Sequence, residues 1–236
     1  FLLSRPQGEA VAASASAERI DAATCVASPA REPITLDSEH GQAMAALAHA
    51  HTARDRITGL LFAAARKRWP DQWRRLAPVP LRLASWVGYD MDGRTDITWA
   101  TSLRYRLSEK AQRLAGYAGA LEKVAPEIAA QLGRAAGYAT DQAAAFAADL
   151  SDPAHLSATA NAFTADHPDK LTSLVPVIAA LEGLAANADD DAAEALLRVV
   201  AAMRADGLGM GWIHFRVNAS QLQNAIRRRI DPDGKL

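Results

Sequence analysis

A short segment of the chain gathers residue types that suit ligand binding: Gly88, Asp90, Asp92, Gly93 and Arg94. Backbone amides beside glycine can receive an anion, and carboxylates can orient a cationic partner. The segment is not a calcium-binding EF-hand loop, because Gly93 follows the second aspartate directly and the distal glutamate is missing. A capping turn explains the same residues equally well, since aspartate and glycine are common turn residues.

Arg216 is the second candidate, because it ends the otherwise apolar stretch 210–215. A guanidinium in such a place needs a partner that offsets its desolvation. A structural ion pair and a bound anion both satisfy this requirement. The basic run 227–229 points in several directions on a helix and is expected to cover a solvated end.

A third polar group interrupts a helical pattern upstream. His51, Arg54 and Asp55 fall near the middle of an apolar stripe that we expect to be buried. Four-residue spacing allows Asp55 to orient the His51 imidazole, whereas His49 and His51 lie on different helical faces and do not suit a shared metal. We therefore expect a hydrogen-bonding role at the surface or between helices. The expected stripe comprises Met44, Leu47, Ile57, Leu60, Leu61 and Ala64.

The elements that position these residues are mainly helical. Alanine, leucine, glutamate and arginine dominate long windows and are strong helix formers. We expect Asp37 or Ser38 to cap a helix that runs to about Trp69, Asp96 to cap another, and Pro126 to open the next. The predicted helices are about 9–25, 37–69, 96–121, 127–149, 153–164, 170–187, 190–205 and 220–229.

Two short segments, about 81–87 and 211–217, have strand patterns bounded by proline or glycine. Each is followed by a polar turn and a helix. In a parallel barrel, the residues at the carboxyl ends of the strands form the catalytic face. This arrangement singles out 88–94 and 216–218 as the positions of a site, and it adds Asn218 to the candidates.

Composition excludes several classes of protein. The 236 residues are half apolar, and 26 basic residues against 27 acidic ones give a net charge of -1, so neither nucleic acid nor an anionic membrane is an expected partner. No apolar run approaches the roughly 20 residues that cross a bilayer. Cys25 is the single cysteine and cannot form an internal disulfide. We expect a soluble protein of the reducing cytoplasm.

Two segments resemble motifs of phosphoenolpyruvate carboxylases. The stretch 83–98, which contains Trp86, Asp90 and Asp92, is similar to a family segment reading serine, tryptophan, any residue, glycine, glycine, aspartate, arginine, aspartate, glycine, asparagine. The stretch 212–220 resembles the family strand that ends in aspartate, isoleucine, arginine, glutamine, glutamate, serine, with Arg216 at the arginine. The order and separation of the two segments suit the family.

The resemblance implies a mainly helical fragment of an α/β, TIM-like barrel, in which 81–87 and 211–217 are parallel barrel strands. The whole chain would be a single partial domain: N-terminal helices (1–78), a strand and site loop (79–98), a helical array (99–206), and a strand with its helix (207–236). Residues 1–5 would follow the family motif that carries the catalytic histidine. We therefore expect an internal piece of a longer protein that is inactive alone.

The family is a carbon–carbon lyase of carbon dioxide fixation, which forms oxaloacetate and phosphate from phosphoenolpyruvate and bicarbonate. By resemblance, Arg216 contacts the substrate phosphate, Trp86 shelters carbon dioxide, and Asp90 and Asp92 hold the loop. Gly88, Gly93, Arg94 and Asn218 are the further substrate-binding candidates. Magnesium or manganese is implied, with ligands outside these residues. A homo-oligomer, tetrameric as in the family, is also implied.

The chain departs from the family pattern at Tyr89, Met91, Arg94 and the stretch 217–219. Retention of Trp86, Asp90, Asp92, Gly93 and Arg216 nevertheless predicts a divergent active enzyme. Two alternatives remain open. One is an inactive paralogue that binds an anionic metabolite through Arg216, and the other is a helical interaction scaffold, which requires a helix rather than a strand at 212–217.

Overall fold

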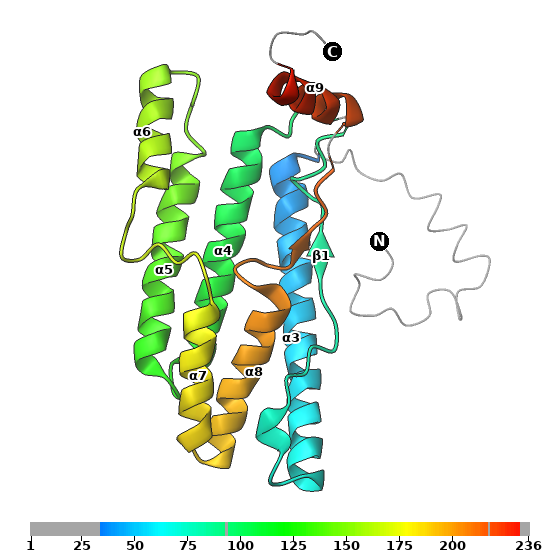
Figure 1. The fold of residues 1–236 in the computed structure, drawn as a ribbon, viewed down its shortest axis with the longest axis vertical. Helices are drawn as coiled ribbons and strands as arrows, with labels where there is room; N and C mark the ends of the chain where they lie inside the picture. The colour runs from blue at the N-terminus through cyan, green and yellow to red at the C-terminus, as the bar shows by residue number, and fades with distance from the viewer. Residues whose placement is uncertain (1–33, 93, 217, 232–236) are drawn as a thin grey trace, which may run out of the picture.

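The computed structural model describes residues 34–92, 94–216 and 218–231. The expected helix at 9–25, Cys25 and Gly93 lie outside the described residues. The described part is mostly helical, with a short 3-10 turn, η2 (Trp73–Arg75), that the sequence pattern did not predict. The helices are α3 (Leu36–Arg68), α4 (Trp99–Leu121), α5 (Pro126–Ala145), α6 (Pro153–Thr164), α7 (Val175–Asn187), α8 (Asp190–Asp206) and α9 (Ala219–Ile230) (Figure 1).

The caps of the two longest helices differ from expectation. The hydroxyl of Thr35 accepts a hydrogen bond from the Ser38 amide at 3.2 Å and caps α3. Thr98 caps α4 in the same way. The predictions of caps at Asp37 or Ser38 and at Asp96 were therefore wrong. A threonine hydroxyl, like a carboxylate, can accept a hydrogen bond from the free amides of the first helical turn.

Proline explains the starts of the middle helices. Pro126 and Pro153 occupy first-turn positions of α5 and α6, as predicted, because proline has no amide hydrogen to leave unpaired there. Two boundaries were wrong: α5 ends at Ala145 rather than near 149, and α7 begins at Val175 rather than 170.

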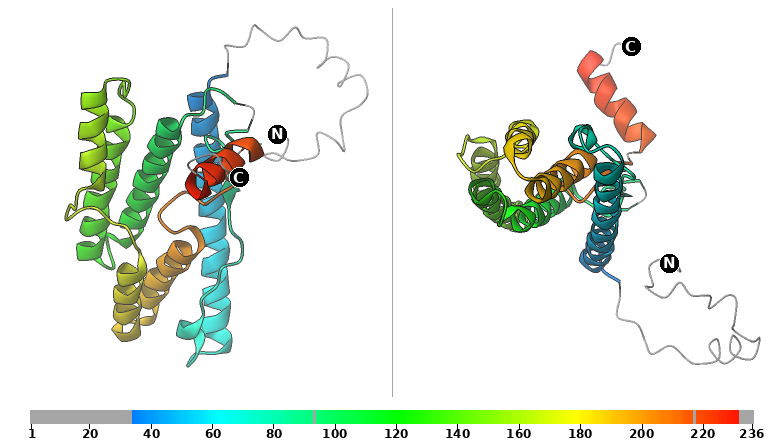
Figure 2. Two further views of the ribbon diagram at one scale, coloured as in Figure 1. Left: turned by 45° about the horizontal axis from the view of Figure 1, so that its top comes forward. Right: turned by 90° about the horizontal axis from the view of Figure 1, so that it is seen from below.

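The helices pack as two hairpins beside the long α3. The α4–α5 and α7–α8 pairs each reverse direction through a short connection, and α8 also contacts α3 and α4 (Figures 1 and 2). One apolar cluster fills the space between them. Burial of each large aliphatic side chain there stabilises the fold by about 1.5–3 kcal/mol. Its fully enclosed members include Phe62, Leu114, Leu121, Leu132 and Leu181.

The predicted buried stripe of α3 was largely wrong. Ile57, Leu60 and Leu61 are exposed, and of that stripe Met44 is buried. The helix instead buries a face that carries His40, His51, Arg54 and Thr58. These polar side chains can be buried because other elements provide hydrogen-bond or ion-pair partners for them. The spacing of apolar residues along the helix gives no information about such partners. They are considered with the site below.

Strands β1 (Ala84–Ser85) and β2 (Trp212–Ile213) form a two-stranded parallel sheet. Both lie within the predicted ranges, and each is shorter than expected. Ala84 pairs with Trp212 and Ser85 with Ile213, so segments on either side of the helical array meet here. Helix α9 follows β2 and extends away from the other helices (Figure 2).

None of the described helices combines the length and the apolar character that crossing a bilayer requires.

Candidate functional site

The backbone pairing of the two strands continues into the loops that follow them. Beyond the strand pair, Arg216 forms an isolated parallel bridge with Asp90. The Arg216 amide donates to the Tyr89 carbonyl at 3.1 Å, and the Met91 amide donates to the Arg216 carbonyl at 3.0 Å. Ser85 pairs with Ile213, and the next pairing is the bridge between Asp90 and Arg216. The segment that follows β1 therefore has two more residues before the bridge than the segment that follows β2. These extra residues make a turn between Trp86 and Tyr89.

Glycine is required in this turn. Gly88 has a φ of 86°, and a Cβ placed there would lie 2.3 Å from the Tyr105 ring. Its carbonyl accepts a hydrogen bond from the Ser102 hydroxyl at 2.7 Å. The turn therefore packs directly on α4, which leaves no room for a side chain at position 88. The candidate role of Gly88 is thus to let the loop approach α4 closely.

The two candidate segments meet through their side chains as well. Nη1 of Arg216 lies 3.0 Å from Oδ2 of Asp90, and Nδ2 of Asn218 lies 3.5 Å from Oδ1 of Asp92. The Arg216 side chain remains 63% exposed. Its other guanidinium nitrogens make no hydrogen bond to any described residue, so donors are left for an anion from solution.

Arg94 lies elsewhere in the loop and has partners of its own. Nε and Nη2 donate to the two carboxylate oxygens of Asp96 at 2.9 and 2.6 Å, and Nη1 donates to Glu39 at 2.9 Å. This bidentate pair and the second carboxylate occupy the fork of the guanidinium. Arg94 thus joins the loop to the start of α3, and its charge is matched locally.

The Trp86 side chain is 59% exposed beside the turn. Its carbonyl accepts the Tyr89 amide at 2.9 Å, so the backbone of the tryptophan is fixed while the indole faces outward. The exposed indole gives the loop an apolar surface.

Tyr89 anchors the loop to the helices from the inside. Its ring is buried, and its hydroxyl donates to Oε1 of Glu109 at 2.8 Å. Nε2 of His40 lies 3.1 Å from the same oxygen, and the His40 ring stacks on Tyr105. Burial and the adjacent Glu109 carboxylate raise the pKa of Tyr89 above its usual range, so the hydroxyl stays a donor. The sequence identified Tyr89 only as a departure from the family pattern and did not predict this anchoring role.

A second polar group lies inside the helical array. Asp206, at the end of α8, is paired with Arg54 on α3 at 2.5 Å and with Arg113 on α4 at 2.6 Å. Nε2 of His51 lies 3.5 Å from the same carboxylate. Of the two expected roles for the polar interruption of α3, at the surface or between helices, the structure shows the second, and Asp55 pairs with Arg54 rather than with His51. Its partners, Asp206 and Arg113, were missed, because the pattern around each is that of an ordinary helix.

This environment keeps His51 uncharged at neutral pH. Burial is the main cause that lowers the pKa of His51 to about 4, and the neighbouring Arg113 and Arg54 charges add to it. The Asp206 carboxylate acts in the opposite direction without overcoming them.

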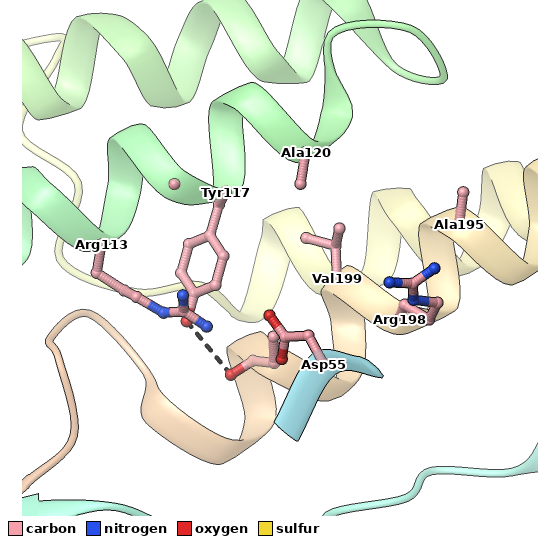
Figure 3. A pocket seen from close by; sticks show the side chains of 9 residues that line it. Asp55, Arg113, Tyr117, Ala120, Ala195, Arg198 and Val199 are labelled. Atoms are coloured by element: carbon pink, nitrogen blue, oxygen red, sulfur yellow. Dashed lines mark hydrogen bonds between the residues drawn. The ribbon is translucent and has the colours of Figure 1, made fainter. Parts of the chain in front are cut away.

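A cavity of about 290 Å³ adjoins the Asp206 cluster between α3, α4 and α8. Figure 3 shows Asp55 from α3, Arg113 and Tyr117 from α4, and Arg198 from α8 around it. No residue of the strands or of the loops after them lines this cavity. It is therefore separate from the loop that carries Asp90 and Arg216.

No group of three or more histidine, cysteine, aspartate or glutamate side chains suited to a metal ion is present within 34–92, 94–216 and 218–231. The family resemblance places the ligands of magnesium or manganese outside these residues.

In comparisons with known proteins, no family model, no curated protein and no solved structure matches the chain.

Proposed function

We propose that the protein is a divergent phosphoenolpyruvate carboxylase, and that the paired segments 84–92 and 212–216, together with Asn218, form part of its active site. The observation that supports this proposal most directly is the bridge between Asp90 and Arg216, which lie 126 residues apart in the sequence. Both belong to segments that resemble family motifs. The parallel pairing supports the proposal because it brings the carboxyl ends of both strands to one edge, as a barrel site requires.

Arg216 is proposed to bind the phosphate of phosphoenolpyruvate. Asp90 engages one terminal nitrogen of the guanidinium and holds the side chain in position, while the remaining donors face solvent. A planar fork of donors suits a phosphate dianion. Asp92 is proposed to position Asn218 in the same way, since the two side chains are in contact.

The proposed reaction transfers the phosphoryl group of phosphoenolpyruvate to a bicarbonate oxygen, which gives carboxyphosphate and the enolate of pyruvate. Carboxyphosphate then breaks its C–O bond to release carbon dioxide and phosphate. The enolate carbon attacks carbon dioxide and forms oxaloacetate. In these reaction steps Arg216 is proposed to stabilise the negative charge of the phosphate, and Trp86 is proposed to shield carbon dioxide and the enolate from water.

The wider architecture belongs to the same proposal. A TIM-like barrel would continue the two-stranded sheet with strands from outside the described residues, and a homo-oligomer in the cytoplasm would follow from the family resemblance. Magnesium or manganese, with ligands outside these residues, would supply Lewis-acid chemistry.

The test is bicarbonate-dependent formation of oxaloacetate by the full-length protein, followed through malate dehydrogenase. Arg216→Ala is expected to lower kcat/KM by about 100-fold or more, since it removes a charged donor. Arg134→Ala is the matched control: its side chain is 60% exposed and also pairs with an aspartate, Asp169, at 3.2 Å. Wild-type activity in Arg216→Ala would reject the assignment.

The two alternatives predict different results. An inactive paralogue would bind phosphoenolpyruvate through Arg216 without turnover. A helical scaffold would require a helix at 212–217, whereas Trp212–Ile213 is a strand, so the structure gives that alternative no support.

A further inference from the structure

Glu109 is a buried carboxylate that lies on α4 next to the loop of the candidate site. Its side chain is 3% exposed, and the proposed reaction gives it no part. Oε1 accepts the hydrogen bond of the Tyr89 hydroxyl at 2.8 Å and lies 3.1 Å from Nε2 of His40. Oε2 accepts a hydrogen bond from Nη1 of Arg106 at 3.3 Å. The two oxygens therefore hold different parts of the chain, and together these contacts satisfy the need of a buried charge for partners.

The first oxygen holds the loop that follows β1. Tyr89 directly precedes Asp90, whose carboxylate pairs with Arg216 at 3.0 Å. The Tyr89 carbonyl also accepts the Arg216 amide at 3.1 Å, so the residue whose side chain reaches Glu109 makes one of the backbone hydrogen bonds of the bridge. A displacement of the Tyr89 side chain would therefore move the backbone that pairs with Arg216.

The second oxygen reaches the segment that leads into β2, through Arg106. A Cβ added at Gly209 would overlap with the guanidinium of Arg106, so this group lies directly against the backbone of Gly209. Its Nη1, which approaches Gly209 most closely, is also the nitrogen that contacts Glu109. Gly209 stands three residues before Trp212, whose amide donates to the Leu83 carbonyl at 2.8 Å. Arg106 thus links the carboxylate to the entry of the second strand.

His40 connects the same carboxylate to α3. Its ring stacks on the Tyr105 ring, with 3.9 Å between the ring centres and 4° between the planes. Gly88 packs on that tyrosine as well, so the turn after β1 contacts the residues that surround Glu109. One carboxylate therefore has contacts that lead to α3, to the loop after β1 and to the segment before β2.

This arrangement needs both carboxylate oxygens. Glutamine has a single acceptor oxygen, with an amide donor in place of the second. It can therefore accept from Tyr89 or from Arg106 but not from both, and its amide would face another donor on the side that loses the acceptor. A role in filling the core would not distinguish the two side chains, because glutamate and glutamine have nearly the same volume.

We propose that Glu109 is a positioning residue of the candidate site. It fixes the loop after β1 relative to the segment before β2, and it thereby sets the pairing of Asp90 with Arg216. It acts through Tyr89 and Arg106 and has no contact with Arg216 itself. The inference rests on the proposed function for its effect on turnover, whereas its effect on the bridge does not depend on which reaction the site carries out.

Amide hydrogen exchange measures the bridge directly, because the amides of Met91 and Arg216 both donate across it. In the full-length protein, Glu109→Gln is expected to speed the exchange of these two amides by about tenfold or more, as loss of one charge-assisted hydrogen bond would. The acceleration should be larger there than at the Leu132 amide, which lies in the apolar core and reports on unfolding of the whole fold. Glu182→Gln is the matched control, because its 40% exposed carboxylate also pairs with an arginine, at 2.5 Å, and should leave the bridge unchanged.

Turnover by the same variant separates this proposal from the proposed function. If the wild-type protein forms oxaloacetate from phosphoenolpyruvate and bicarbonate, Glu109→Gln should lower kcat/KM by about tenfold or more, because the site is misplaced. Faster exchange at the bridge in a protein without carboxylase activity would support the positioning role and reject the carboxylase assignment. Unchanged exchange at Met91 and Arg216, an equal acceleration at Leu132, or an active Glu109→Gln variant with wild-type kcat/KM would overturn the positioning role.

Discussion

Tyr89 shows how one residue fixes the candidate loop. Its hydroxyl hydrogen bond to Glu109 crosses from the loop to α4. Tyr89→Phe should lower the free energy of unfolding by about 1–2 kcal/mol, because a buried carboxylate loses a donor. Urea unfolding measures this change. Tyr138→Phe is the control, since the Tyr138 hydroxyl makes no hydrogen bond within the described residues; equal losses in both variants would contradict the anchoring role.

His51 makes the stability of the protein depend on pH. Its pKa in the folded state, about 4, is below the ordinary value of 6.5, so the unfolded chain binds the proton more readily. The stability that depends on neutral His51 is therefore complete above pH 6.5 and is lost as the pH falls towards 4. The groups that face the imidazole are Arg54, Arg113 and Asp206.

Replacement of His51 should remove this dependence. Between pH 7 and 5, His51→Gln is expected to show a smaller decrease in unfolding free energy than wild type, by about 1–3 kcal/mol. Urea unfolding at several pH values checks it. His167→Gln provides the control, because His167 has a 44% exposed side chain. The expectation fails if His51→Gln keeps the wild-type slope.

At the scale of elements, side-chain caps determine where helices begin. Asp189 caps α8 by accepting from the amides of Asp191 and Ala192 at 3.0 and 2.9 Å. Asp189→Ala should cost about 1 kcal/mol of stability, whereas Asp189→Asn, which retains an acceptor, should cost less. Thermal or urea unfolding distinguishes the two variants. A loss as large for asparagine as for alanine would indicate another role for the carboxylate.

At the scale of the whole molecule, Asp206 joins three helices that are distant in sequence. Asp206→Ala would leave Arg113 buried without a carboxylate and Arg54 with Asp55 alone, so we expect a loss of about 3–5 kcal/mol in unfolding free energy. Glu182→Ala removes the exposed pair with Arg204, also at 2.5 Å, and should cost less than about 1 kcal/mol. Denaturant titration compares them, and similar effects would show that the buried cluster does not stabilise the fold.

The sequence by itself determined the local features of the protein. Helix formers, first-turn prolines such as Pro126 and Pro153, and the short strand patterns predicted most elements, because these signals act within a few residues. The same local pattern placed polar residues after both strands. It also located the polar interruption at His51 and Arg54, although it misplaced the buried face of α3.

Only the tertiary structure decided which distant groups meet. Asp90 and Arg216 come together through strand register, and Asp206 and Arg113 reach Arg54 through helix packing. Neither pairing leaves a periodic trace in the sequence, because each partner satisfies its local pattern without the other. The cavity likewise arises from the spacing of three helices, so the residues that line it are brought together only when those helices are packed.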